Sequence, residues 1–386
     1  MTTADMPALA ATVDLGAIGH NVRVVTERAG APVIAVVKAD GYGHGAAPVA
    51  RAALAAGAAE LGVAHLTEAL ALRSAGIDAH ITSWLHTPST DFAAGIAADI
   101  DLAVSSPRQL AAVVAAARAA GVTATVTAKV DTGLNRSGIA ADEWEHTAHQ
   151  LAQAQAEGAV RLRAMMCHLA FGDEPDHPMN SQQAAHLDSA AADLKRRGVI
   201  PQVLHLANSP AALTRPDLAR DLVRPGLALY GCSPIPSRGD FGLIPAMTLS
   251  AEVALVKKVA AGQGVSYNHR WVAPNDTMVA VLPAGYADGV PRLLSERFEV
   301  SINGRRFPGV GRICMDQLVV NLGPDGGGVR EGDRAVLFGA NTPGEPAVPK
   351  AVDWADSVDT IDYEIISGIH GRAQRRYVGD PGGEVR

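Results

Sequence analysis

Aromatic residues make up only 4% of this 386-residue chain, and cysteine occurs three times. Cys167, Cys232 and Cys314 are an odd number and lie far apart in the sequence. A disulfide framework is therefore not expected. A reducing, cytoplasmic environment is expected instead. Basic residues are not in excess either, because the formal net charge is −7. This balance argues against a partner that is nucleic acid or an anionic membrane surface.

Long apolar segments and several catalytic signatures are also missing. The apolar stretch Ala111–Ala117 ends at Arg118 and is too short to span a bilayer. Residues 1–10 lack a basic segment followed by an apolar core, so no signal peptide is predicted. The chain contains no HExxH, paired CxxC, Walker A or G-x-S-x-G motif, and its histidines show no metal-ligand spacing. We therefore expect no membrane segment and no metal site.

What the chain does contain is a regular alternation of short apolar strands and alanine-rich helical stretches from Thr12 to Gly231. The predicted strands are Val33–Val37, Leu61–Ala64, His80–Leu85, Leu102–Val104, Ala124–Val130, Leu162–Cys167, Val203–Leu206 and Leu222–Val223. The predicted helices between them include Ala46–Ala59, Thr67–Ala75, Pro107–Ala120, Ala140–Glu157 and Ser181–Arg197. Eight such alternations predict an α/β fold with a (β/α)8 TIM-type barrel. An open, doubly wound sheet is the alternative that the same pattern permits.

The pattern changes near Phe241, after the proline- and glycine-bearing linker Ser233–Pro245. The predicted strands beyond it are Leu249–Val259, Thr277–Leu282, Arg297–Ile302, Arg312–Val320 and Arg334–Phe338, with a two-residue hairpin turn at Asn303-Gly304. Because 386 residues exceed the usual size of one core, two domains are expected. They are a barrel over residues 1–240, whose first ten or so residues are not assigned, and a β-rich C-terminal domain over 241–386.

Polar residues gather where the predicted barrel strands end. They are Lys38, Lys129, Asp131, Arg136, His168, Asn208, Ser209, Arg224 and Gly226. Active sites of such barrels lie at this rim, and the loops after strands 7 and 8 often hold phosphate. The placement predicts an enzyme.

Lys38 is the most informative of these residues. It ends the apolar run Val33–Val37 and precedes a glycine-rich segment. Burial lowers the pKa of a lysine, and a neutral amine can form a Schiff base with a carbonyl cofactor. The alternative is a lysine that extends into solvent from the strand end.

Arg224, Arg136 and Tyr267 each have a chemical and a plain interpretation, and Lys129 is considered with Arg136. Arg224 stays protonated, so it can donate to a ring nitrogen without giving up a proton, or it can be a structural ion-pair residue. Arg136 can clamp a carboxylate or lie in a solvated loop. Lys129, close to Arg136 in sequence, needs an anion or a modification beside it. Tyr267 can act as a base where positive charge stabilises its phenolate, or it is a packed aromatic.

Seven spaced motifs are similar to those of the alanine racemases, pyridoxal-phosphate enzymes of fold type III. They are Val36–Gly45 (VVKADGYGHG), Lys129–Gly138 (KVDTGLNRSG), Val223–Gly231 (VRPGLALYG), Gly264–Trp271 (GVSYNHRW), Leu282–Gly289 (LPAGYADG), Gly311–Gln317 (GRICMDQ) and Thr360–Ile366 (TIDYEII). The resemblance covers nearly the whole chain. It implies an N-terminal barrel, a β-rich C-terminal domain, and a head-to-tail homodimer with two shared sites.

The resemblance also implies roles for individual residues. Lys38 resembles the Schiff-base lysine and D-face base, and Tyr267 of the other subunit resembles the L-face base. Arg224 resembles the partner of the pyridine nitrogen, with His168 as its neighbour. The positions that match the phosphate cradle are Tyr42, Asn208, Ser209, the Gly226 and Leu227 amides, and Tyr363. Arg136 and the Met315 amide match the substrate-carboxylate clamp, Tyr286 and Tyr363 the entryway, and Lys129 a position often carbamylated.

Two departures from the family pattern are visible. Asn268 stands where glycine is usual, and we expect the loop to keep its geometry because both residues tolerate left-handed backbone angles. Residues Gly368–Gly371 also differ from the usual pattern.

The leading function that the resemblance implies is interconversion of L- and D-alanine, which supplies D-alanine for peptidoglycan. Two enzyme alternatives are a racemase of broader amino-acid specificity and a fold-type-III decarboxylase. The decarboxylase would be expected to place an acid, not Arg224, against the ring nitrogen. A pyridoxal-phosphate carrier is the non-enzyme alternative. Carriers resemble single barrels, so the β-rich domain bearing Tyr267 argues against it.

Overall fold

The computed structural model describes residues 6–341, 344 and 346–380. They form two compact units. The barrel unit comprises Ile18–Gly41 and Ala46–Leu243, and the β unit comprises the described residues up to Ala17, Tyr42–Gly45, and those from Ile244 onward.

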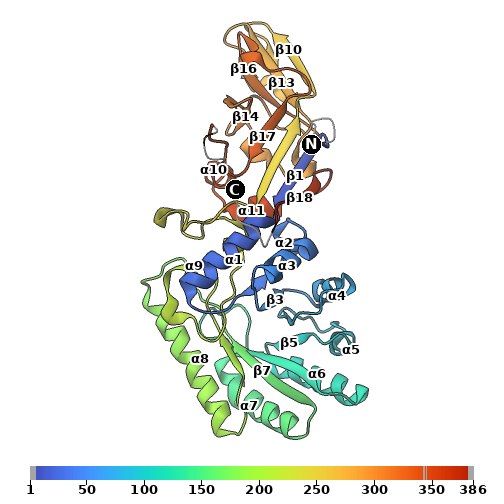
Figure 1. Ribbon diagram of the computed structural model, residues 1–386, viewed down its shortest axis with the longest axis vertical. Helices are drawn as coiled ribbons and strands as arrows, with labels where there is room; N and C mark the ends of the chain where they lie inside the picture. The colour runs from blue at the N-terminus through green and yellow to red at the C-terminus, as the bar shows by residue number, and fades with distance from the viewer. Residues whose placement is uncertain (1–5, 342–343, 345, 381–386) are drawn as a thin grey trace. The chain divides into compact units, whose positions relative to one another are not determined.

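The barrel unit contains a seven-stranded sheet in which the strands run parallel and follow one another in sequence order. The strands are β2 (Ile34–Val36), β3 (Glu60–Val63), β4 (Ile81–Ser83), β5 (Asp101–Val104), β6 (Ala124–Lys129), β7 (Val160–Met166) and β8 (Val203–His205). Helices follow the strands and lie on the outer side of the sheet (Figure 1). The predicted fold class, a TIM-type barrel with a separate, mostly β domain, is confirmed.

The expected eighth strand is not a regular strand. Leu222–Val223 forms only an isolated bridge between Val223 and Val33. The segment still joins the two edge strands, because Ile34 N in β2 donates to Val223 O at 2.8 Å and Asp221 N donates to Leu204 O in β8 at 3.0 Å. Val36 N also donates to Pro225 O at 3.2 Å, but Pro225 has no N–H to donate in return, which explains why the segment does not form a regular strand.

The barrel helices follow local sequence signals closely. They are α1 (Leu15–Ala29), α2 (Lys38–Tyr42), α3 (Ala46–Ala55), α4 (Leu66–Ser74), α5 (Phe92–Ala97), α6 (Pro107–Ala120), α7 (Ala141–Ala156), α8 (Pro178–Arg196) and α9 (Ser209–Thr214). Helix α6 has the predicted bounds, because the Ser106 hydroxyl caps Gln109 N at 3.3 Å and Gly121 ends the helix at φ 67°. Helix α1 was not predicted, although its buried residues Ile18, Val22 and Val25 have helical spacing.

The β unit has sheets of six, three and two strands. The six-stranded sheet contains β15 (Arg305–Pro308), β14 (Glu299–Ile302), β17 (Arg334–Phe338), β9 (Met247–Glu252), β1 (Leu9–Asp14) and β18 (Gln374–Val378), in that order. The smaller sheets contain β10 (Leu255–Val259), β13 (Thr277–Leu282) and β16 (Leu318–Gly323), and β11 (Gly264–Val265) with β12 (Trp271–Val272). The described part of this unit also contains two short α-helices, α10 (Ala351–Ser357) and α11 (Asp362–Ser367).

Two of the five predicted β segments, Thr277–Leu282 and Arg334–Phe338, have the observed bounds, and the hairpin turn is confirmed. Asn303 and Gly304 adopt φ 49° and 75° between β14 and β15, as a tight hairpin requires. Leu249–Val259 is instead two strands, β9 and β10, in different sheets. The prediction Arg312–Val320 is wrong in its first half, because Cys314 N donates to Gln317 O and closes a turn before β16 begins.

None of the helices in the described part of the chain is long and apolar enough to cross a membrane. The three cysteines are free, as the sequence predicted.

Candidate active site

Lys38 opens a turn of left-handed backbone. Helix α2 carries positive φ angles at Ala39 (53°), Asp40 (52°) and Gly41 (63°), and Tyr42 follows at 51°. For residues other than glycine this conformation costs roughly 1–2 kcal/mol each. Two side-chain acceptors hold the turn: Glu68 Oε1 accepts from Ala39 N at 2.6 Å, and Asp40 Oδ1 accepts from Ala46 N at 2.8 Å. Backbone strain of this kind is common at functional sites, where it fixes a reactive side chain.

The amine of Lys38 is easier to deprotonate than an ordinary lysine. Burial lowers its pKa, the positive charge of Arg136 lowers the pKa further, and Glu68 opposes the change. A larger fraction of the amine is therefore neutral and nucleophilic at physiological pH. This is the property that the sequence predicted for it.

Lys129 ends strand β6 and is buried. Burial is the main cause that lowers its pKa to about 8, and Arg136 and Arg224 add to the effect. Its Nζ donates to the hydroxyl and, at 3.1 Å, to the carbonyl of Ser137 in the loop that follows. The structure thus places Lys129 and Arg136 within electrostatic reach of each other.

Arg224 is buried and oriented by two neighbouring strands. Its Nη1 donates to His205 Nδ1 and to His205 O, both at 2.7 Å, and its Nη2 donates to Cys167 O at 2.6 Å. Since an arginine can only donate, Nδ1 of His205 is the acceptor and the ring is neutral. Burial lowers the pKa of Arg224 to about 10, which leaves the guanidinium protonated at neutral pH.

His168 lies directly after strand β7 among positive charges. Burial and then Arg224, Arg136, Lys129 and Lys38 lower its pKa to about 3. The imidazole is therefore neutral at physiological pH and can accept or donate a hydrogen bond.

The predicted phosphate residues of the barrel come together around Ser209. The Ser209 hydroxyl accepts from Gly226 N at 2.9 Å and from Ala228 N at 3.2 Å, which ties the loop after Val223 to the start of α9. Asn208 caps the same helix by accepting from Ala211 N at 3.3 Å. Leu227 follows Gly226 in a short 3₁₀ turn.

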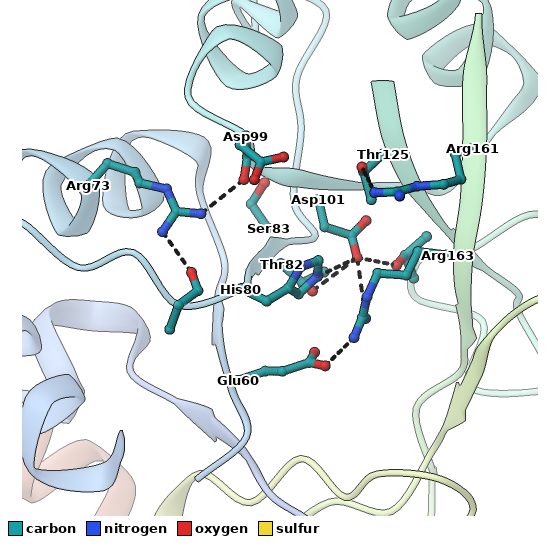
Figure 2. A network of polar contacts seen from close by, with 12 residues as sticks. Glu60, Arg73, His80, Thr82, Ser83, Asp99, Asp101, Thr125, Arg161 and Arg163 are labelled. Carbon is teal, nitrogen blue, oxygen red and sulfur yellow. Dashed lines mark hydrogen bonds and ion pairs between the residues drawn. The ribbon is translucent and has the colours of Figure 1, made fainter. Parts of the chain in front are cut away.

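A network of charged and polar side chains joins strands β3, β4, β5 and β7 of the barrel sheet. Figure 2 shows Asp101, which is fully buried and accepts from His80 Nε2 at 3.1 Å and Thr82 Oγ1 at 3.3 Å. Arg163 forms an ion pair with Glu60, and its Nη1 lies 3.8 Å from Asp101 Oδ2. Burial and then Arg224 lower the pKa of His205, and Arg163 and His80 add to the effect. The network therefore acts on the residue that orients Arg224.

In the β unit, the predicted residues form two groups. The rings of Tyr42 and Tyr363 lie 6.2 Å apart between centroids, and burial raises the pKa of Tyr42. The second group comprises Tyr267, Tyr286 and Met315, with exposed fractions of 67%, 42% and 52%. Tyr286 N donates to Cys314 O at 3.1 Å, so Tyr286 and Met315 lie on adjoining loops.

Tyr267 projects from a strained turn beside the same loop. Ser266 has φ 64° and ψ −171°, a region that glycine normally occupies, and its hydroxyl donates to Arg312 O at 2.7 Å. Asn268 adopts φ 61°, the left-handed conformation expected at this position.

Three residues of the barrel site were missed by sequence reasoning. His205 orients Arg224, Glu68 supports the turn after Lys38, and Ser137 binds Lys129. Ser137 lies within the KVDTGLNRSG motif, which could have drawn attention to it. The sequence has no comparable signal for His205 or Glu68, because their roles depend on contacts between different strands and helices.

Comparison with known proteins identifies relatives over nearly the full length. Models of the alanine racemase N-terminal and C-terminal domains match residues 13–234 and 246–377. An alanine racemase of Mycolicibacterium vanbaalenii is 59% identical over 97% of this chain and 95% of its own. One of Mycobacterium tuberculosis is 56% identical over 95% of each chain. The solved alanine racemase of Streptomyces lavendulae has a TM-score of 0.93 at 47% identity, covering 97% of this chain and 98% of its own.

Proposed function

This chain belongs to the alanine racemase family, and we propose on that basis that it interconverts L- and D-alanine with pyridoxal 5'-phosphate. The D-alanine would serve peptidoglycan synthesis in the cytoplasm, as the family resemblance and the free cysteines suggest. The observation that carries the proposal is Arg224, a buried, protonated guanidinium held by His205 and the Cys167 carbonyl.

The residues of the barrel rim fit an anionic cofactor. Arg224, Arg136, Lys129 and Lys38 all lower the pKa of His168 through their positive charge, and such a group of basic side chains favours binding of an anion. Lys38 would hold the cofactor covalently, and Ser209, Gly226 and Leu227 would bind its phosphate with Asn208. The family resemblance assigns Tyr42 and Tyr363 to the same phosphate. When bound, pyridoxal phosphate withdraws electrons and acidifies the Cα proton of an amino acid.

Arg224 favours racemisation over the decarboxylase alternative. A protonated arginine donates a hydrogen bond to a ring nitrogen but does not transfer its proton. Placed against the ring of a bound cofactor, Arg224 would leave the ring nitrogen unprotonated. It would thereby limit electron withdrawal by the ring and disfavour proton return to the wrong carbon.

Two bases are required, one for each face of the substrate. Lys38 has the lowered pKa that a base on one face needs. We propose Tyr267 of the second subunit as the base on the other face. Its 67% exposure and its strained turn present the phenol outward, where another chain can receive it. The protein would then act as a homodimer with shared sites.

The substrate carboxylate has two proposed donors. Arg136 offers a guanidinium, and Met315 offers its backbone N–H. Within the described residues no group accepts a hydrogen bond from that N–H. Tyr286 and Tyr363 would narrow the entryway and thereby limit the size of the substrate.

We also propose that Lys129 is carbamylated. Carbamylation requires a neutral amine, and a pKa of about 8 makes one available near neutral pH. The resulting anion would pair with Arg136. Incubation with ¹³C-labelled bicarbonate should give a carbamate signal in the NMR spectrum that is absent from Lys129→Ala. A spectrum in which wild type and variant are the same would refute this assignment.

The function is tested by incubating the purified protein and cofactor with a panel of chiral amino acids. We expect racemisation of alanine in both directions and little turnover of larger side chains. The Lys38→Ala variant should lose the visible absorbance of the lysine-bound cofactor together with the activity. Comparable turnover of many amino acids would favour the broader racemase, and cofactor binding without any turnover would favour the carrier.

A further inference from the structure

Arg372 joins two loops of the β unit through a fork of hydrogen bonds. Its Nε donates to Asp288 Oδ1 at 2.8 Å, and its Nη2 donates to Asp288 Oδ2 at 2.9 Å. Its Nη1 donates to Asp316 Oδ1 at 2.7 Å. One guanidinium therefore binds a carboxylate on each of the two loops, which carry Tyr286 and Met315.

Backbone contacts make the two loops one assembly. Tyr286 N donates to Cys314 O, and Ala287 N donates to Met315 O, both at 3.1 Å. Asp288 is buried, and its Oδ2 also accepts from Gly285 N at 3.0 Å. A movement of Asp288 would thus displace the segment that bonds directly to Met315.

Two glycines allow the segment that carries Arg372 to pack closely against the Tyr286 loop. Gly371 has φ 67°, and a Cβ there would lie 2.5 Å from Ala287 O. A Cβ at Gly289 would lie 1.9 Å from Gly368 O. The departure from the family pattern at Gly368–Gly371 therefore falls in a segment packed tightly against the Tyr286 loop.

Charge gives Arg372 a second role. Asp316 directly follows Met315, and Asp288 lies on the adjoining loop, so two carboxylates flank the N–H proposed to bind the substrate carboxylate. Two uncompensated negative charges there would repel an anionic ligand. Arg372 binds both carboxylates and cancels part of this repulsion.

We propose that Arg372 is a positioning residue for substrate-carboxylate recognition: it fixes the Met315 N–H and shields it from Asp288 and Asp316. This rests on the proposed function, which assigns the substrate carboxylate to Met315. Arg372 does not itself touch substrate. It acts through the two loops that it joins.

The test compares Arg372→Ala and Arg372→Lys with Arg305→Ala, an exposed arginine of β15 in the same unit. We expect Arg372→Ala to raise the KM for alanine about ten-fold. The inhibition constant of propionate, a carboxylate without the amine, should rise in parallel, while cofactor absorbance and the Arg305→Ala values stay unchanged. Arg372→Lys should recover only part of the loss, because it restores charge without the fork.

Adding Asp316→Asn to Arg372→Ala should lower the KM again by removing one repulsive charge. The proposal is overturned if Arg372→Ala keeps the wild-type KM and propionate affinity, or if only kcat falls. If Arg372→Ala does not fold, the same measurements on Arg372→Lys test the proposal. A KM of Arg372→Lys equal to that of wild type then overturns it. A wild-type protein that does not racemise alanine would instead refute the proposed function, and propionate binding would still report on Arg372.

Discussion

His168 shows what the barrel rim does to a single residue. Burial and four positive neighbours lower its pKa to about 3, whereas an unfolded histidine titrates near 6.5. Above pH 6.5 the His168 ring is neutral in the folded and the unfolded chain, so it adds nothing to the pH dependence of the free energy of unfolding. As the pH falls below 6.5, His168 binds a proton in the unfolded chain but not in the folded chain. The free energy of unfolding therefore decreases.

The first prediction follows from that difference. Between pH 7 and pH 4 the wild-type free energy of unfolding should fall by about 3 kcal/mol more than that of His168→Gln. Denaturant unfolding at the two pH values measures it. His149→Gln, on the exposed face of α7, is the control and should follow the wild type. If the free energy of unfolding falls equally in wild type and His168→Gln, His168 is not the cause of the pH dependence.

At the same scale, the sequence was most informative where chemistry is local. Lys38, Arg136 and Arg224 were identified because their motifs place them at strand ends. His205 was not, because it ends an apolar strand and its contact with Arg224 depends on how the segment after β8 pairs with it. The fully buried Asp101 escaped notice for the same reason, since its partners come from other strands.

Among the elements, the turn after Lys38 has a run of left-handed backbone from Ala39 to Tyr42. Ala39 has a left-handed backbone that glycine adopts at little cost. The turn keeps this conformation because Glu68 and Asp40 bind its amides.

The Ala39→Gly variant should therefore raise the free energy of unfolding by about 1 kcal/mol. Ala112→Gly, at an exposed position in α6, should lower it by about 1 kcal/mol, because glycine is unfavourable in an ordinary helix. Chemical denaturation measures the free energy of unfolding of both variants and of the wild type. If Ala39→Gly destabilises the protein as Ala112→Gly does, the turn is not strained.

Element boundaries were predictable where a cap or turn residue marks them. Ser106 and Gly121 define α6, and Asn303-Gly304 defines the hairpin. The segment Arg312–Gln317 was mistaken for strand because its apolar residues resemble one, while its turn depends on a backbone bond between Cys314 and Gln317. Val253 and Ala254 separate β9 from β10 without any turn residue, so the division was invisible in the sequence.

At the scale of the whole molecule, the first strand belongs with the last. Strand β1 pairs in parallel with β18 and antiparallel with β9, so the N-terminal strand lies in the β unit. Local patterns cannot reveal this, because the partners are distant in sequence and the pairing is settled by the sheet as a whole. The overall fold class was predictable because eight alternations allow few architectures.

The proposed homodimer with shared active sites predicts complementation between two inactive variants. Lys38→Ala retains Tyr267, and Tyr267→Phe retains Lys38. When their subunits are exchanged, each mixed dimer should contain one site with both residues intact. Statistical mixing then gives about one quarter of the wild-type activity.

Racemase assays of the mixture, with differently tagged copies to verify exchange, measure this recovery. Mixed dimers that form but remain inactive would place both bases in the same subunit. Self-mixtures of each variant, which should stay inactive, serve as controls.

In the proposed mechanism, Lys38 and Tyr267 exchange the Cα proton on opposite faces of the substrate. The most direct test follows deuterium uptake from D₂O into each enantiomer of alanine by the Tyr267→Phe variant. We expect D-alanine to exchange still through Lys38, while exchange of L-alanine and racemisation fall by about 10²-fold or more. Wild-type exchange of both enantiomers in this variant would contradict it.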